Sequence, residues 1–390
     1  MDLDAFRWLL TEPGQQLLSR AAAAGDDPLR ASAALRRDAG AEHVAAALTQ
    51  TELRRRAVAK FGDDAARMYF TPDGLEQATR RPVARHRAAR LVAAQTGTTI
   101  DLGCGIGGDL VAVAEAGMTV AGVDLDPVRV AVARANLDAL GFGGAVTVAD
   151  ATTVDHAGFD VAFADPARRT ARGRSFAVDD WTPPWPFVQA LLTRTSCVKV
   201  APGIPHDLVP ESVEAEWVSD HGEVKEAALW SGSLATTRRR ATVIGEGGLA
   251  TLTDEDAPPA GEGPGAVREV GAFLYEPDGA VIRAGLVTAV AAGVDGGLVD
   301  EHIAYVTADA AFRTPFARSY RVVEELPYKE KALRAALRER GIGRLAIKKR
   351  GVSVVPEELR KRLSLAGDSE GTIVLTRVAG KGVCLLVEPL

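Results

Sequence analysis

Three aspartates, Asp101, Asp124 and Asp150, stand at or just after the ends of short apolar runs. A carboxylate in such a position can pair with a cationic amino group or accept hydrogen bonds from ribose hydroxyls or an adenine amino group. Asp101 opens the sequence DLGCGIGG (residues 101–108), whose glycines let the backbone turn tightly and approach a ligand. The spacing therefore predicts a site for a nucleoside-containing cofactor.

The same glycines also fit the fingerprint of nicotinamide dinucleotide enzymes, because Gly103, Gly105 and Gly108 satisfy G-x-G-x-x-G. Asp101 favours a different cofactor. Directly before the glycines, its carboxylate would repel a pyrophosphate but attract the α-amino group of a cofactor that carries an amino acid. Asp124, about twenty residues further on, is expected as a ribose ligand for both cofactor classes. Glycines at a strand-to-helix turn can also be purely structural.

Short apolar runs alternate with helical stretches between residues 98 and 244, which predicts an α/β fold with a doubly wound, Rossmann-like parallel sheet. The carboxyl ends of parallel strands meet at one edge, so the three acids are expected to line one crevice. Late in the segment the intervening helices disappear. We therefore expect an antiparallel pair of strands at one sheet edge within residues 213–244.

With these elements in order, residues 98–244 resemble the class I S-adenosylmethionine methyltransferases. In that family an acid-Leu-Gly-x-Gly turn binds the methionine moiety, and the acids at the next two strand ends hold ribose and adenine. The resemblance implies S-adenosyl-L-methionine as the cofactor. The cofactor-binding residues it implies are Asp101, Gly103, Gly105, Gly107, Asp124, Leu125, Asp150 and Ala151.

A fourth apolar run, residues 159–164, leads into Asp165-Pro166-Ala167-Arg168 at the expected crevice edge. Enzymes that methylate exocyclic amines commonly carry Asp or Asn, two prolines and an aromatic here, so Asp165 and Pro166 match and the next two residues depart. Arg168 can stack its guanidinium plane on a base or bind a phosphate. Asp165, Pro166 and Arg168 are the candidate catalytic residues. Because alignment can provide most of the acceleration of an in-line methyl transfer, Asp165 is expected to orient the acceptor.

Trp181 and Trp185 follow this motif and offer a stacking face for a substrate base, although either can instead be a core residue of a loop that enters a helix. His206, in a Pro/Gly-rich loop, is more typical of a polar surface residue. Lys199, on the expected fifth strand, is assigned no role.

The chain divides into an N-terminal helical region (1–75), the methyltransferase domain (76–248), an acidic Pro/Gly linker (249–265) and a C-terminal α+β region (266–390). Pro82 is expected to interrupt the helix that leads into the first strand. Residues 245–301 carry a net charge of −9, whereas residues 313–362 carry +9. Such a basic module favours contacts with RNA phosphates, with Lys348, Lys349 and Arg350 as candidates, over ordinary solvated helix faces.

The overall composition bounds the class of protein. The chain has 390 residues, 47% hydrophobic and 25% charged, with a net charge of −6, which excludes disordered and fibrous proteins. Cys104, Cys197 and Cys384 lie far apart, so we expect neither a disulfide framework nor a metal site, and a cytoplasmic location. The acidic N-terminus and the lack of an apolar run near ~20 residues predict neither export nor a membrane partner.

The whole chain resembles a bacterial family of uncharacterised methyltransferases with a C-terminal THUMP-like domain, placed here at about 318–390. The residues that carry this resemblance are 75–79 (LEQAT), 165–169 (DPARR), 275–278 (YEPD) and 356–361 (PEELRK). The family is more distantly related to trimethylguanosine synthase and other RNA guanine-N2 methyltransferases, which implies tRNA or rRNA as the partner.

The leading prediction is methylation of an exocyclic base amine of structured RNA, most simply guanine N2. One alternative is a methyltransferase that acts on a small molecule or a protein, with the basic module serving for docking. Another is a non-catalytic RNA-binding protein that retains the cofactor fold. The oligomeric state is not predicted.

Overall fold

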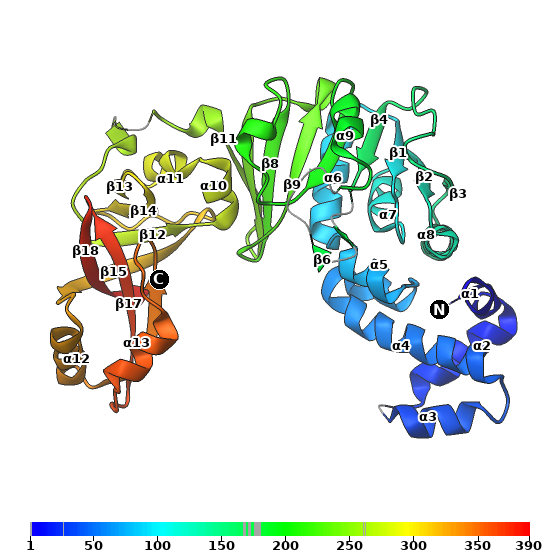
Figure 1. Cartoon of the computed structure of the whole chain (residues 1–390), viewed down its shortest axis with the longest axis horizontal. Coiled ribbons are helices and arrows are strands. Elements are labelled where there is room, and N and C mark those ends of the chain that lie inside the picture. The colour runs from blue at the N-terminus through cyan, green and yellow to red at the C-terminus, as the bar shows by residue number, and fades with distance from the viewer. Residues whose placement is uncertain are drawn as a thin grey trace. The chain divides into compact units, whose positions relative to one another are not determined.

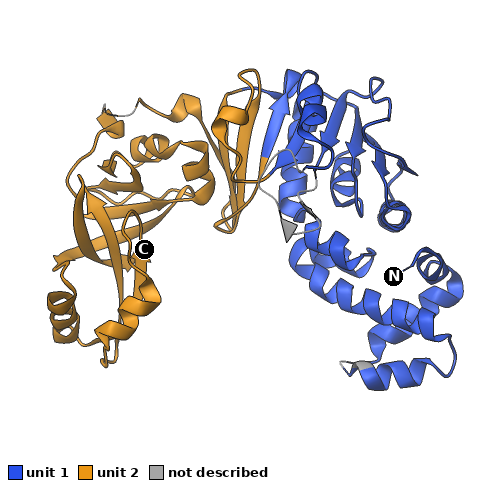
Figure 2. Ribbon diagram, viewed as in Figure 1, with its two compact units in different colours: residues 1–200, 228–236 blue, residues 201–227, 237–390 orange. Residues whose placement is uncertain are grey.

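The computed structural model of the chain describes residues 2–25, 27–166, 169–170, 173–174, 181–259, 261 and 263–390 (Figure 1). The chain forms two compact units, one of residues 1–200 with 228–236 and one of residues 201–227 with 237–390 (Figure 2). This division differs from the predicted limits of 76–248 and 266–390. It passes through a single strand, β9 (Glu223–Ser231), which contributes residues to both units.

Helices form the first part of unit 1, as the fold prediction requires. They are α1 (Leu3–Leu9), α2 (Glu12–Ala23), α3 (Pro28–Leu35), α4 (Ala41–Phe61), the 3-10 helix η1 (Gly62–Ala66) and α5 (Pro72–Gln77). The side chains of Asp2, Thr11 and Thr71 accept hydrogen bonds from first-turn amides, which explains where α1, α2 and α5 begin. Apolar residues such as Phe6 and Phe70 form a core with Val132, so these helices pack on the α/β part of the same unit.

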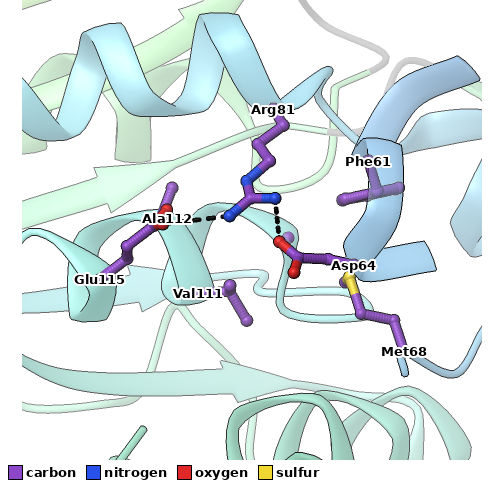
Figure 3. A pocket seen from close by; sticks show the side chains of 8 residues that line it. Phe61, Asp64, Met68, Arg81, Val111, Ala112 and Glu115 are labelled. Atoms are coloured by element: carbon purple, nitrogen blue, oxygen red, sulfur yellow. Dashed lines mark hydrogen bonds and ion pairs between the residues drawn. The ribbon is translucent and has the colours of Figure 1, made fainter. Parts of the chain in front are cut away.

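The predicted break near Pro82 is found. Helix α6 (Arg81–Ala93) begins separately from α5, and Pro82 lies in its first turn, where the missing N–H disrupts no helical hydrogen bond. Arg81, at the start of α6, pairs with Asp64 of η1 and, at 3.0 Å, with Glu115 of α7 (Gly108–Glu115). Figure 3 shows these three side chains around a small pocket. This cluster ties three helical elements of unit 1 together.

The sheet of unit 1 is parallel, with the order β7-β4-β1-β2-β3. Its strands are β1 (Thr98–Leu102), β2 (Thr119–Asp124), β3 (Ala145–Val148), β4 (Val161–Ala164) and β7 (Ser196–Val200). The helices between them are α7, α8 (Pro127–Leu140) and α9 (Trp185–Leu191), and β5 (Arg169–Thr170) pairs with β6 (Gly173–Arg174) apart from this sheet. The strand order reverses between β1 and β4. Ligands bind at the carboxyl edge of such a reversal in open α/β sheets.

The expected antiparallel pairing at a sheet edge is present, but as part of a more elaborate arrangement. β8 (Glu214–Asp220) and β9 are neighbours joined by His221 and Gly222, which both have positive φ angles, as a two-residue hairpin turn demands. β10 (Arg239–Gly245) then pairs in parallel with β8 and antiparallel with β11 (Gly248–Thr253). The turn between β10 and β11 therefore makes a second hairpin.

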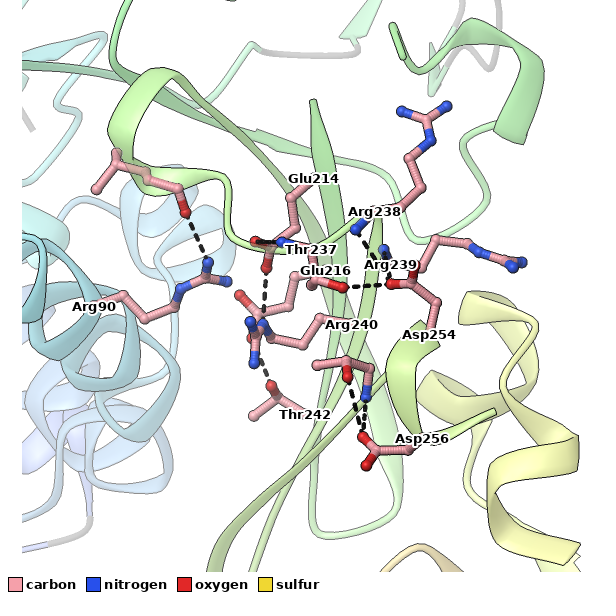
Figure 4. Close-up of polar contacts among 12 residues, drawn as sticks. Arg90, Glu214, Glu216, Thr237, Arg238, Arg239, Arg240, Thr242, Asp254 and Asp256 are labelled. Atoms are coloured by element: carbon pink, nitrogen blue, oxygen red, sulfur yellow. Dashed lines mark hydrogen bonds and ion pairs between the residues drawn. The ribbon is translucent and has the colours of Figure 1, made fainter. Parts of the chain in front are cut away.

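Strand β11 and the 3-10 helix η5 (Asp254–Asp256) occupy the start of the predicted linker, 249–265. Composition alone favoured a linker, but the alternating residues Leu249, Thr251 and Thr253 pair with β10. Asp254 accepts hydrogen bonds from the backbone amides of Arg239 (2.9 Å) and Arg238 (3.2 Å) and from the Thr237 hydroxyl (Figure 4). These contacts order the acidic segment by giving its carboxylates local partners.

The remainder of unit 2 contains a seven-stranded sheet with the order β13-β14-β12-β15-β18-β17-β16. The strands are β12 (Phe273–Pro277), β13 (Gly297–Asp300), β14 (Ile303–Ala308), β15 (Ala317–Leu326), β16 (Ile342–Lys349), β17 (Ser369–Val378) and β18 (Lys381–Pro389), and the helices are α10 (Gly279–Ala284), α11 (Val287–Gly293), α12 (Glu330–Glu339) and α13 (Pro356–Leu363). Short 3-10 helices elsewhere are η3 (His206–Leu208), η4 (Gly232–Leu234) and η6 (Gly263–Gly265). Leu333 and Leu337 of α12 and Leu359 and Leu363 of α13 pack in one apolar core. The predicted α+β order of the basic module is confirmed.

Across the described ranges, every helix is too short or too polar to span a bilayer.

Candidate active site

The strand register of unit 1 brings four strand ends level. Leu102 of β1 lies beside Val123 of β2 and Ala164 of β4, and Ala164 lies beside Val198 of β7. The next residue on each chain is therefore part of one row along the carboxyl edge. That row contains Gly103, Asp124, Asp165 and Lys199. The structure thus places Asp124, a predicted binding acid, in one row with Asp165, the predicted catalytic acid, and adds a lysine to which the sequence assigned no role.

The glycine loop adopts the backbone that only glycine adopts easily. Gly103, Gly105 and Gly107 have φ angles of +116°, +54° and +79°. A Cβ at Gly103 or Gly105 would meet no atom within 4 Å, so this side of the loop is open. A Cβ at Gly107 would instead lie 3.0 Å from Ala133 of α8. Close packing of α8 therefore explains Gly107, and its predicted cofactor contact stays a prediction.

Asp101 is buried, with only 3% of its surface exposed. Within the described ranges, its Oδ1 atom has no hydrogen-bond partner, although an unpaired buried carboxylate oxygen is costly. Burial raises the pKa of the Asp101 carboxyl well above its ordinary value, and the nearby charges of Asp109 and Asp165 raise it further. A cation placed against Oδ1 would satisfy both the unpaired oxygen and the unfavourable charge.

Asp124 and Asp150 differ in their surroundings. The carboxylate of Asp124 accepts hydrogen bonds from the amides of Gly105 (3.0 Å) and Asp126 (2.9 Å), so it braces the glycine loop. Asp150 is exposed, and hydrogen bonds from the side chain and backbone of Thr152 lower the pKa of its carboxyl. The amide of Ala149 bonds to the carbonyl of Asp124 at 3.1 Å, which keeps the ends of β2 and β3 together.

The two apolar candidates next to these acids, Leu125 and Ala151, differ in their solvent exposure. Leu125 is 62% exposed, which is unusual for a leucine and leaves it available to cover a base. Ala151 is partly buried.

Asp165 follows β4 and pairs with Lys199, with 2.5 Å between Asp165 Oδ2 and Lys199 Nζ. Pro166 is buried beside it, and the third candidate, Arg168, lies outside the described residues. Lys199 also donates to the Thr79 hydroxyl at 3.2 Å. Thr79 in turn donates to Asp109 at 2.9 Å.

Asp109 completes this network through its other oxygen, which pairs with Arg87. The Arg87 guanidinium is buried and lies 4.7 Å from the ring centroid of Phe163 on β4. Sequence reasoning missed Thr79, Arg87, Asp109 and Lys199. A single lysine at the end of the apolar run SCVKV was the available signal for one of them, whereas only the fold reveals the other three.

Trp181 and Trp185 are both buried and contact each other edge to face, with ring centroids 5.4 Å apart. The indole nitrogen of Trp181 is buried and has no hydrogen-bond partner among the residues that the structure describes. Their mutual packing explains Trp185 as a core residue at the start of α9. The unpaired Trp181 N–H is the feature that packing does not explain.

The three basic candidates in unit 2 are not equivalent. Lys348 is partly buried and forms an ion pair with Glu276 at 2.6 Å, close to the ring of Tyr320. Its charge is therefore already matched within the protein, which weakens its assignment as an RNA contact. Arg350 lies over the ring of Tyr305, at 5.5 Å from the centroid. Lys349 is exposed, and no ion pair is found for it among the described residues.

A parallel sheet that reverses between β1 and β4, with a glycine turn after β1 and acids level with the ends of β2 and β4, has the architecture of the class I methyltransferases. Residues 100–170 match a methyltransferase domain, residues 317–389 a THUMP domain-like module, and residues 2–57 a domain of unknown function.

An uncharacterised S-adenosylmethionine-dependent methyltransferase of Mycobacterium tuberculosis is 38% identical over 343 residues, which span 84% of this chain and 91% of that protein. The chain belongs to this family of S-adenosylmethionine-dependent methyltransferases. The crystal structure of a protein from Porphyromonas gingivalis W83 assigned as a methyltransferase covers 99% of this chain and 97% of that one, with a TM-score of 0.72 and 22% identity. At that identity the likeness concerns the fold alone.

Two observations fit S-adenosylmethionine to the site. The buried, unpaired Oδ1 of Asp101 suits a cationic amino group, and the open side of Gly103 and Gly105 leaves room for a ligand against the backbone. The site therefore agrees with the cofactor of the family.

Proposed function

We propose that the protein methylates an exocyclic amine of a base in structured RNA, most simply guanine N2. The observation that carries this proposal is the Asp165 carboxylate, which stands at the end of β4 in the same row as the predicted cofactor residues. Among the contacts of the described residues, its Oδ2 atom is held by Lys199 and its Oδ1 atom has none. Oδ1 can therefore accept a hydrogen bond from an amine and direct the nitrogen lone pair.

The cofactor, when bound, supplies an electrophilic methyl group. In this proposal Asp101 binds its amino group, Gly103 and Gly105 allow its close approach, Asp124 accepts from the ribose hydroxyls and Asp150 accepts from the adenine amine. Leu125 and Ala151 cover the base. Pro166 shapes the backbone after Asp165.

The acceptor side of the site rests on positioning rather than on a strong base. Asp165 would fix the orientation of the amine, and the unpaired N–H of Trp181 offers a donor for a polar group of the base. Arg168, three residues after Asp165 in the sequence, stays a candidate for stacking or phosphate binding.

The RNA part of the proposal is supported by the THUMP domain-like match over 317–389 and by the basic residues of that module. Lys331, Lys349 and Lys361 are exposed, and among the described residues they have no ion-pair partner. Such side chains can contact phosphates without first breaking an internal ion pair. A cytoplasmic location fits an RNA substrate.

The test is to incubate the purified protein with radiolabelled S-adenosylmethionine and separate fractions of tRNA, rRNA, protein and small molecules from a strain that lacks it. Nucleoside analysis of labelled RNA would identify the methylated atom, and N2-methylguanosine is expected. Label only in protein or small molecules would overturn the RNA proposal in favour of a docking role for the basic module. Cofactor binding with no label in any fraction would favour a non-catalytic RNA-binding protein.

Replacing Asp165 tests its role directly. Asp165→Asn should lower kcat by roughly 100-fold, because the amine loses its anionic acceptor while the affinity for S-adenosylmethionine is retained. The measurement is steady-state methylation of the labelled fraction together with calorimetric cofactor binding. Asp155→Asn, which changes an exposed loop acid, is the matched control. Normal turnover of Asp165→Asn would place the acceptor elsewhere.

A further inference from the structure

Lys199 has a position that strand packing does not require. β7 is otherwise uncharged and buried, and its one charged side chain, 15% exposed, reaches Asp165 at 2.5 Å and Thr79 at 3.2 Å. An ammonium placed in such a strand loses hydration, so it persists only where partners compensate that loss. Those partners are a residue of the reacting edge and a residue of the segment 75–79, which the proposed chemistry leaves unexplained.

The direction of every hydrogen bond in this network is fixed by chemistry. A lysine ammonium can only donate and an ionised carboxylate can only accept. Thr79 has a single hydroxyl proton, so it accepts from Lys199 and donates to Asp109. The result is one ordered series of contacts, Asp165–Lys199–Thr79–Asp109–Arg87, in which the neutral Thr79 hydroxyl bridges two ion pairs.

This series of contacts joins several helices and strands of unit 1. Asp165 follows β4, Lys199 lies on β7, Thr79 lies between α5 and α6, Asp109 starts α7 and Arg87 lies on α6. Arg87 is itself held against Phe163 on β4, two residues before Asp165. Both ends of the network therefore return to the strand that carries the reacting acid.

We propose that Lys199 and Thr79 are positioning residues that hold the Asp165 carboxylate in one orientation, with Oδ2 engaged and Oδ1 left for the acceptor. This inference rests on the proposed role of Asp165. It also gives a function to residues 75–79: Thr79 connects the segment that precedes the sheet to the acceptor site.

The kinetic test compares Lys199→Met with Lys199→Arg. Loss of the ammonium should lower kcat by roughly 100-fold, as expected for a misplaced acceptor-orienting group, with little change in the KM for RNA or in cofactor affinity. Arginine restores a donor and should recover most of that loss. Thr79→Val should lower kcat and Thr79→Ser should not. The matched control is Lys225→Met, because Lys225 is similarly buried and pairs with Glu223 at 2.5 Å.

Unchanged kcat in Lys199→Met would overturn the inference. So would equal losses in Lys199→Met and Lys199→Arg accompanied by equal drops in Tm, since these would indicate a purely structural lysine. If the wild-type protein labels only protein or small molecules, the RNA proposal fails but the same comparison is made on the labelled acceptor.

A second measurement needs no acceptor. In protein labelled with ¹⁵N-lysine, the ammonium signal of Lys199, identified by its loss in Lys199→Arg, should shift in both Asp165→Asn and Thr79→Val. Glu223→Gln should leave it in place. A Lys199 signal that responds to neither partner would overturn the network even for a protein in which no methylation is detected.

Discussion

Asp101 is a residue whose burial makes little sense without a ligand. Its carboxylate lies near Asp109 and Asp165, and one of its oxygens has no hydrogen bond. A buried acid with raised pKa costs stability when it ionises, and proteins retain such groups mainly at functional sites. A bound ammonium group offsets this cost of ionisation, because it favours the ionised carboxylate.

Cofactor binding should therefore release a proton. In the free protein the raised pKa keeps part of Asp101 protonated at pH values where an ordinary aspartate is ionised, and a bound ammonium lowers that pKa, so protons leave and affinity rises with pH. Calorimetry of S-adenosylmethionine binding in two buffers of different ionisation enthalpy measures this release. Asp101→Asn should abolish it and weaken binding about tenfold or more.

Asp150→Asn is the control for that experiment. Hydrogen bonds lower the pKa of Asp150, so this acid is already ionised and has no proton to give up. The variant should bind more weakly yet release the same proton. Wild-type binding without proton transfer would contradict the role assigned to Asp101.

At the residue scale, the acids could be predicted because each follows an apolar run and the register of a parallel sheet makes their convergence a rule. Lys199 carries the same signal, yet a lone lysine has no characteristic spacing, so its partners could not be named. Thr79 lies between two helices and Arg87 lies on α6, and the packing of both depends on the tertiary fold.

At the scale of elements, the ion pairs between α6 and α7 attach the segment before the sheet to the helix that follows the glycine loop. Glu115 is the centre of this cluster, bonded to Arg85 at 2.5 Å and to Arg81 at 3.0 Å. Figure 3 shows the pair with Arg81. The hydrogen bond from Arg85 is the main cause that lowers the pKa of the Glu115 carboxyl. Because Arg85 is half exposed, the contribution to stability is modest.

Glu115→Gln should reduce the free energy of unfolding by about 0.5–1 kcal/mol near neutral pH. A folded-state pKa below the unfolded value stabilises the protein above the unfolded pKa, about 4.3, and this stabilisation is lost as the pH falls. The difference between variant and wild type should therefore shrink on acidification. Urea unfolding from about pH 7 to 3.5 measures it.

Glu52→Gln, at an exposed position of α4, controls for the loss of one negative charge. A stability difference for Glu115→Gln that does not change with pH would contradict the linkage argument. It would point to packing of the side chain instead.

The elements themselves were predictable where a single period dominates. Pro82 predicts the start of α6, because proline is best tolerated in the first turn of a helix. The basic module alternates strand and helix as expected. The composition of the acidic segment after residue 248 predicts a linker, whereas a short alternation of residues forms β11 at its start. Its order comes from Asp254 and Asp256, whose carboxylates accept from nearby backbone amides (Figure 4).

For the whole molecule, the net charge of the basic module overstates its free positive charge. Arg340 pairs with Glu324, Arg344 with Glu370, Arg362 with Glu330, and Lys348 with Glu276. These pairs involve acids both inside and outside the basic stretch, and only contacts reveal them. Binding of RNA should therefore depend on the exposed lysines that lack such partners among the described residues.

Replacing Lys331, Lys349 and Lys361 together by Ala should weaken RNA binding and reduce its salt dependence while cofactor affinity stays unchanged. Each lost phosphate contact makes the negative slope of log K against log salt less steep by about 0.7–0.9, so the loss of three contacts makes it less steep by about two to three. Arg7, Arg20 and Arg30, all exposed on the N-terminal helices, provide a triple-Ala control with the same change in net charge. Titrations of tRNA at several salt concentrations measure both variants. Equal losses in the two would mean that net charge rather than the THUMP-like module attracts RNA, because only a local phosphate contact distinguishes one set of cations from the other.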